Sequence, residues 1–291
     1  MRKVTGGLIV ALILAAPRPI AAWGFEGHKY IMEAAIPLLP AEIRPFFVAN
    51  RISIIEHAID PDLWRTAGFE QETPHHFTDM DAYGPYPFTS LPHIQSEAVT
   101  KYGREMVDKN GTLPWRAEEI YAKLVEAFTQ KSGYSRDNIK FFSSVIAHYV
   151  ADAHVPFHAC LNHDGQLTGQ TGIHARFETE LFGRYRSQLV VKPGPIVAVP
   201  NARELVFASL TESFTFVQPI LDADRAAIAG RDTYDDGYFT LFFSKTRSIL
   251  EKRLTGSIED VAAVIAAAWV QAGRPALPLE AVRVPRPVSR Q

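Results

Sequence analysis

The sequence has 291 residues, of which 47% are hydrophobic, and a formal net charge of −2. These values are typical of an ordinary globular protein and exclude the strongly basic surface that grips duplex DNA. The single cysteine, Cys160, excludes an internal disulfide, so the chain must be stabilised by its core or by bound metal.

Residues 1–22 have the pattern of a secretory signal peptide. A positive start is followed by an apolar run from Leu8 to Ala16 and by a small-residue exit that ends at Ala22. The alternative, a retained membrane anchor, is disfavoured because the run is too short to span a bilayer. We therefore expect no stable membrane span, cleavage after Ala22, a mature chain that begins at Trp23, and a secreted or periplasmic location.

The rest of the chain has the apolar spacing of helices, with few alternating strand patterns. Residues 278–291 are rich in Pro, Arg and Val and are expected to be disordered. The sequence therefore predicts an all-α fold with a single helical domain over residues 23–277. The expected helices cover residues 27–39, 41–58, 94–107, 115–131, 135–155, 174–191, 201–229, 236–253 and 257–272.

Proline, glycine and polar residues separate these helices. Residues 59–65 are expected to form a turn that carries Asp60, Asp62 and Arg65, and residues 84–93 and 161–173 to form loops. The capping-box pattern that begins at Ser257 predicts the start of a separate last helix.

Two pairs of possible metal ligands lie in the middle of the sequence. His148 and Asp152 are four residues apart, and so are His174 and Glu178. Positions i and i+4 share one face of a helix, so each pair points an imidazole and a carboxylate at one place. Such donors bind a borderline cation such as zinc, and His158 is a further donor between the two pairs.

Four motifs resemble the zinc-dependent phospholipase C and single-strand-specific nuclease superfamily. Trp23-Gly-Phe-Glu-Gly-His28 is similar to the mature N-terminus of that family, and His76-Phe-Thr-Asp to its second histidine motif. The segment from His148 through Asp152 to His158 is similar to its central motif, and His174-Ala-Arg-Phe-Glu178 to its last.

The resemblance implies three zinc ions in a cleft of the helical domain and hydrolysis of a phosphoester by metal-activated water. One zinc would take Asp62, His76, His148 and Asp152. A second would take the α-amine and carbonyl of Trp23, His28 and the shared Asp152. A third would take His158, His174 and Glu178.

Several alternatives stay open on the sequence alone. Asp60 is the alternative to Asp62 as a ligand, and Arg65 can contact the phosphate or form a surface ion pair. His154 is interpreted as a hydrogen-bonding residue behind the ligands, and the histidines outside the motifs as surface or packing residues: His57, His75, His93 and His163.

The substrate is either a phospholipid head group or single-stranded nucleic acid. Glu178 resembles the phospholipase branch, which we favour, whereas Arg65 resembles the branch of single-strand-specific endonucleases and 3′-nucleotidases. Aromatic residues that can stack on a base are Phe69, Tyr83, Tyr86 and Phe88. A different class of function is a non-catalytic, secreted zinc-binding protein. We predict no protein partner.

Overall fold

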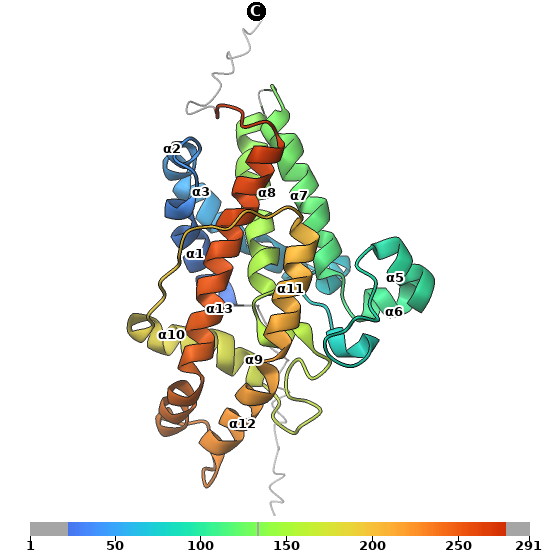
Figure 1. The fold of residues 1–291 in the computed structure, drawn as a ribbon. Helices are drawn as coiled ribbons and strands as arrows, with labels where there is room; N and C mark the ends of the chain where they lie inside the picture. The colour runs from blue at the N-terminus through green and yellow to red at the C-terminus, as the bar shows by residue number, and fades with distance from the viewer. Residues whose placement is uncertain (1–22, 133, 278–291) are drawn as a thin grey trace, which may run out of the picture.

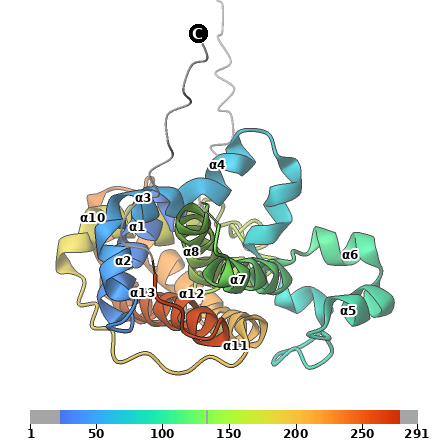
Figure 2. The same ribbon diagram turned by 90° about the horizontal axis from the view of Figure 1, so that it is seen from above.

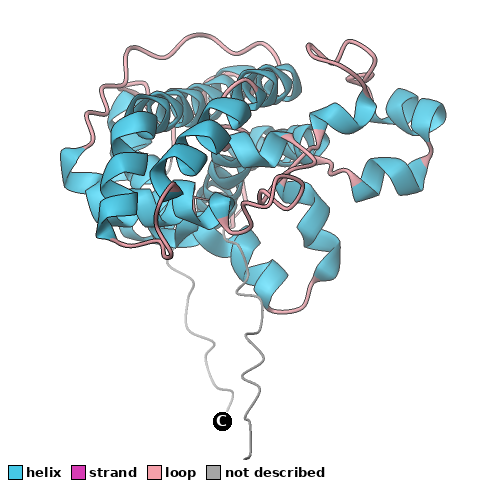
Figure 3. Ribbon diagram, turned by 90° about the horizontal axis from the view of Figure 1, so that it is seen from below, coloured by secondary structure: helices cyan, strands magenta, loops and turns pink. Residues whose placement is uncertain are grey.

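In the computed structural model, residues 23–132 and 134–277 are described, and every regular element in these ranges is helical (Figure 3). The predicted all-α fold is therefore confirmed for the described residues. The α-helices are α1 (Gly24–Ala35), α2 (Arg44–Ala49), α3 (Arg51–Glu56), α4 (Asp60–Thr66), α5 (Gln95–Tyr102), α6 (Arg104–Lys109), α7 (Leu113–Thr129), α8 (Ser135–Asp152), α9 (Ile173–Ala175), α10 (Leu181–Tyr185), α11 (Ala202–Phe214), α12 (Val217–Ile228) and α13 (Asp236–Gln271).

Short turns of other helix types join these elements. Six are 3₁₀ turns and one, η6, is a turn of π-helix. They are η1 (Ile36–Leu38), η2 (His57–Ile59), η3 (Glu70–His76), η4 (Met80–Tyr83), η5 (Pro156–Ala159), η6 (Arg176–Glu180) and η7 (Arg186–Gln188).

The long helix α13 packs against several other helices of one compact helical domain. Helices α1, α7, α8 and α12 all contact it, and α11 lies against α7 (Figures 1 and 2). Helices α5 and α6 project from the side of this bundle (Figure 2). The described part of the chain contains no helix that is both long and apolar enough to cross a membrane.

Helix α8 lies in the centre of the core. Every residue from Ser143 to Asp152 is buried, so this end of the helix has no face toward solvent. A helix that is buried all round belongs to a core, and its polar side chains need partners there. His148 and Asp152 are such side chains.

Helix α13 shows where the sequence prediction was wrong. We expected two helices with a start at Ser257, but a single helix runs from Asp236 to Gln271. The Ser257 hydroxyl donates to the Arg253 carbonyl at 2.9 Å, so it bonds back along the helix instead of capping a new one. Leu254 and Ile258 are both fully buried, and core packing therefore carries the helix through this point.

Other boundaries also differ from the prediction. Residues 60–66 form the short helix α4 where a turn over 59–65 was expected, because Pro61 occupies the first turn of a helix, where proline is tolerated. The expected helix over 201–229 is two helices, α11 and α12, and the one over 41–58 is also divided. The predicted signal peptide and the predicted disordered tail lie outside the described residues.

Candidate metal centre

Three groups of buried side chains each bring their ligand atoms within 4.8 Å of one another. His148 belongs to two of the groups, so these two are contiguous. Each group can hold a metal ion. The groups are His28, His148 and Asp152; Asp62, His76 and His148; and His158, His174 and Glu178.

The ligand atoms come from segments that are far apart in the sequence. Helix α1 supplies His28, α4 supplies Asp62, η3 supplies His76, and α8 supplies its pair. The third group comes from η5, α9 and η6. The centre therefore lies where the N-terminal, central and later parts of the domain meet.

The Asp152 carboxylate connects these groups. Its Oδ1 lies 3.3 Å from Nε2 of His28 and 3.9 Å from Nδ1 of His158. Its Oδ2 lies 3.1 Å from Nδ1 of His76 and 3.3 Å from Nε2 of His148. Four histidines from four elements thus surround one carboxylate, which is the geometry that a bridging ligand requires.

Asp62 lies in the centre and Asp60 does not. Asp62 Oδ1 is 3.8 Å from Nδ1 of His76 and accepts a hydrogen bond from Arg65 Nη2 at 2.9 Å. Asp60 instead contacts the exposed ring of His57 at 2.8 Å. The structure therefore brings Asp62 and Arg65 to the centre and leaves Asp60 outside it.

A backbone carbonyl fixes the orientation of the His148 ring. Its Nδ1 lies 2.9 Å from the carbonyl oxygen of Ala58, and a carbonyl can only accept, so Nδ1 carries the proton. In the neutral ring, the lone pair of Nε2 then faces Asp152 and His76. A backbone carbonyl behind a ligating histidine is a common support of metal sites, because it fixes the tautomer and the direction of the ring.

In the third group, His174 and Glu178 meet across one helical turn. His174 Nε2 lies 3.0 Å from Glu178 Oε2, as the predicted i,i+4 spacing requires. Glu178 lies in η6, and π turns of this kind are frequent at functional sites. Its side chain is fully buried, and the backbone N–H of Trp23 donates a hydrogen bond to it.

The electrostatics of the groups favour ligation. Burial lowers the pKa of His174 to about 3 and that of His158 well below its usual range, so both rings are neutral and have a free lone pair. His148 is the exception: burial would lower its pKa, but the Asp152 and Asp62 charges raise it to about 9, so a metal ion must displace a proton from this ring. Burial raises the pKa of Glu178 well above its usual range, and a cation beside this carboxylate would favour its ionised form.

Many buried polar atoms of these side chains have no hydrogen-bond partner among the described residues. Unpaired polar atoms are costly inside a protein, and their concentration at one place indicates that something else binds there. These atoms are His28 Nδ1 and Nε2, Asp62 Oδ2, His76 Nε2, Asp152 Oδ1, His158 Nδ1, His174 Nδ1 and Glu178 Oε1.

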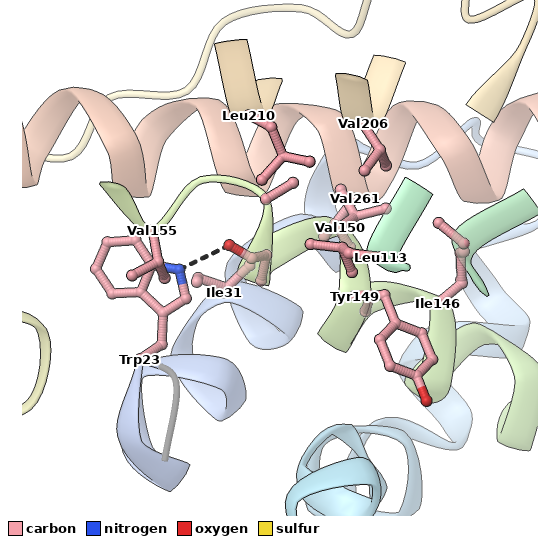
Figure 4. Close-up of a cluster of buried hydrophobic side chains, with 14 of the residues drawn as sticks. Trp23, Ile31, Leu113, Ile146, Tyr149, Val150, Val155, Val206, Leu210 and Val261 are labelled. Carbon is pink, nitrogen blue, oxygen red and sulfur yellow. Dashed lines mark hydrogen bonds between the residues drawn. The ribbon is translucent and has the colours of Figure 1, made fainter. Parts of the chain in front are cut away.

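Trp23 is completely buried beside the centre. Its indole N–H donates to the carbonyl of Ala151 at 2.8 Å, so it bonds to the last turn of α8 (Figure 4). Gly27 makes room for it, because a Cβ at that position would lie 2.9 Å from the Cβ of Trp23. Ligation by the Trp23 α-amine and carbonyl stays a prediction.

Glu72 is a residue of the centre that the sequence prediction missed. Its Oε1 lies 3.7 Å from Nε2 of His76, and it accepts a hydrogen bond from the hydroxyl of Tyr149. Arg116 lies 3.6 Å from its other oxygen. Glu72 and His76 have the same i,i+4 spacing that identified the other pairs, so this signal was present in the sequence.

The remaining histidines lie outside the three groups. His154 was interpreted as a hydrogen bond behind the ligands, but its Nε2 contacts Asp260 on α13 at 2.9 Å. The others contact surface or packing residues: His57 contacts Asp60, His75 Thr112, His93 Glu204 and His163 Gln166.

The four aromatic residues considered for base stacking differ in exposure. Tyr83 and Phe88 are buried in the core, whereas Tyr86 and Phe69 are exposed. Phe69 lies at a pocket of about 320 Å³, between the helix that carries Asp62 and the turn that carries His76. The lining residues are Trp64, Phe69, Gln71, Glu72 and His75.

Comparison of the sequence with models of protein families gives no match, and comparison with curated proteins gives none either. The observations that bear on the function of this protein are therefore the geometry of the centre and the motifs in the sequence.

Proposed function

We propose that this protein is a secreted, zinc-dependent phosphodiester hydrolase with a trinuclear metal centre. The observation that carries the proposal is the convergence of three buried ligand groups on Asp152. A structural zinc site is closed by four ligands and has no need of such an assembly, which argues against the alternative of a non-catalytic zinc-binding protein.

Nitrogen and carboxylate donors in these numbers fit zinc. We assign Asp62, His76, His148 and Asp152 to one ion. Trp23, His28 and Asp152 are assigned to the second, and His158, His174 and Glu178 to the third. Bound zinc would neutralise the phosphate and lower the pKa of a water molecule toward neutrality.

The side chains of the chain itself have three tasks in this proposal. Asp152 would hold two of the ligand groups at a fixed separation. Metal bound there could then act on an attacking water and on a leaving oxygen at the same time. Arg65, bonded to Asp62 at 2.9 Å, is placed to contact a phosphate oxygen with its guanidinium. His148 keeps its lone pair toward the centre through the carbonyl of Ala58. No side chain is required as a covalent nucleophile.

The favoured substrate is a phospholipid head group, in a phospholipase-C-like reaction. Glu178 supports this choice, because a glutamate at this position resembles the phospholipase branch of the superfamily. The second candidate is a single-strand-specific endonuclease or 3′-nucleotidase. It is supported by the exposed ring of Phe69 and by Trp64 in the pocket beside the centre, because aromatic faces stack on bases.

Parallel assays of the zinc-loaded protein on phosphatidylcholine micelles and on single-stranded DNA test these candidates. We expect release of diacylglycerol, its loss with chelator, and its recovery when zinc is restored. Digestion of DNA without release of diacylglycerol would reverse the order of the two candidates. Turnover of neither substrate, nor of a generic phosphodiester chromogen, would favour the zinc-binding protein.

A further inference from the structure

Arg176 lies between two proposed ligands of the third zinc, His174 and Glu178, and is itself buried. A residue two positions along a helix points to the opposite face. Arg176 therefore points away from the metal centre, and its guanidinium reaches the later helices instead.

The partner of Arg176 is Asp224 on α12, which is 1% exposed. Asp224 Oδ1 accepts hydrogen bonds from Arg176 Nε at 3.3 Å and from Nη2 at 3.1 Å. The hydroxyl of Tyr238, at the start of α13, donates to the same oxygen. Gln170 Nε2 donates to the other oxygen at 2.7 Å. Both oxygens of this carboxylate are therefore occupied by groups from three different segments.

The proposed ligands His174 and Glu178 lie on α9 and η6, which together form the ligand helix. The same guanidinium also binds the loop before this helix. Its Nη1 donates to the carbonyl of Thr171 at 2.9 Å, and its Nη2 to that of Gln170 at 3.1 Å. Gly172, which precedes α9, has φ +86°, and a Cβ there would lie 2.8 Å from Nη1. Glycine at this position thus allows the arginine to approach the loop.

We propose that Arg176 and Asp224 are positioning residues that set the rotation of the ligand helix and so aim His174 and Glu178 at the third metal. The inference rests on the proposed metal centre. It also gives α12 and the start of α13 a role, although neither supplies a ligand. The physical reason is that the ligand atoms of a functional site must be held to within about 0.5 Å of their working positions. The contacts of Arg176 on the opposite face of the helix prevent the helix from rotating.

The test follows the release of zinc during titration with a chelator in the wild type, Asp224→Asn and Tyr238→Phe. Asp224→Asn keeps the shape of the side chain but removes its charge from Arg176. We expect one of three zinc ions to leave at a chelator concentration roughly 10–100-fold lower, as for other residues that support ligands, and the other two to leave as in the wild type. Tyr238→Phe should shift the same ion in the same direction by a smaller factor.

The matched control is Leu250→Ala, which removes a fully buried side chain of α13 and lowers thermal stability without touching Arg176. All three zinc ions should leave this variant as they leave the wild type. Unchanged release from Tyr238→Phe and Asp224→Asn would overturn the inference, and so would an equal shift in Leu250→Ala. If Asp224→Asn does not fold, Tyr238→Phe decides. The zinc content of the wild type is measured first. A wild type without a third zinc would overturn both the proposed centre and this inference before any variant is made.

Discussion

Asp152 is the residue on which the proposed chemistry most depends. It is fully buried, and the nitrogens of four histidines lie within 4 Å of its two oxygens. Arg65 contributes differently, because it bonds to Asp62 at the edge of the centre and keeps about a fifth of its side chain exposed. The two residues should therefore differ in the effect of their removal.

Replacement of Asp152 by Asn removes a negative charge from a site that, in the proposed centre, would hold several dications. We expect at least one zinc to be lost and turnover to fall by roughly a thousandfold or more, because metal-ion catalysis contributes several kcal/mol. Arg65→Ala should keep its zinc and lose about a hundredfold, as for the loss of one transition-state contact. Metal analysis and steady-state kinetics measure both. An Asp152→Asn variant with most of its zinc and turnover would show that this carboxylate is not a bridge.

Arg253 is a second buried arginine, far from the ligand helix of the third group. It donates to the carbonyl of His154 at 3.1 Å and to the hydroxyl of Ser213 at 2.8 Å, and it pairs with Glu212. Burial would raise the pKa of Glu212, but Lys252 and Arg253 lower it below its usual value. A carboxyl with a lowered folded-state pKa stabilises the fold at neutral pH, and this contribution is lost as the pH falls through that pKa.

We therefore expect Glu212→Gln to lower the free energy of unfolding at pH 7 by about 0.5–1 kcal/mol, and the melting temperature with it. A charged partner is lost, but the Glu212 side chain is 44% exposed, so solvent screens its ion pairs. The difference from the wild type should begin to shrink as the pH falls below the ordinary glutamate pKa of about 4.3, and it should vanish once the pH is below the lowered folded-state pKa. Thermal unfolding of both proteins with chelator present measures this without interference from metal loss. A difference that stays constant from pH 7 to pH 3 would contradict the assigned pKa direction.

The sequence predicted residue pairs within one helical turn better than it predicted the ends of helices. The i,i+4 pairs that begin at His148 and His174 do share one face, because helical periodicity is a property of neighbouring residues. The contact of Arg176 with Asp224 had no such signal, since the two residues come together only in the fold. The same reason explains Ser257, where packing overrode a local start signal.

Gly256 shows how packing and helix propensity oppose each other in α13. A Cβ at this position would lie 2.9 Å from Cε1 of His154, whose ring is held by Asp260. Gly256→Ala should therefore destabilise the protein by about 1–3 kcal/mol, although alanine favours a helix by about 1 kcal/mol.

Gly183 is the control, because it is an exposed residue of α10 and a Cβ there would meet nothing within 4 Å. Gly183→Ala should stabilise the protein by about 0.5–1 kcal/mol. Thermal or urea unfolding of both variants measures the difference. Equal stabilisation by the two changes would show that His154 moves aside at no cost.

Across the whole molecule, the centre joins segments that extend from His28 to Glu178 in the sequence. If zinc binds these segments only in the folded chain, its binding free energy is also folding free energy. If Trp23 is a ligand, this coupling depends on processing, because its nitrogen is a free amine only after the bond to Ala22 has been cut. An amide nitrogen is a poor ligand, whereas an amine with a pKa near 8 loses its proton readily beside a dication.

A protein that begins at Trp23 and one that carries an additional alanine before it should therefore differ. We expect the extended protein to fold, to keep two zinc ions per chain and to lose most of its turnover. Metal analysis and kinetics of the two proteins measure this. The same zinc content and the same turnover in both would show that the N-terminus is not a ligand.

The metal content of the mature, zinc-loaded protein tests the trinuclear centre most directly. After removal of loosely bound metal by dialysis, the proposed centre predicts close to three zinc ions per chain, together with a lower melting temperature once a chelator has removed them. A firm value of one zinc or none, with no change in melting temperature on chelation, would contradict it.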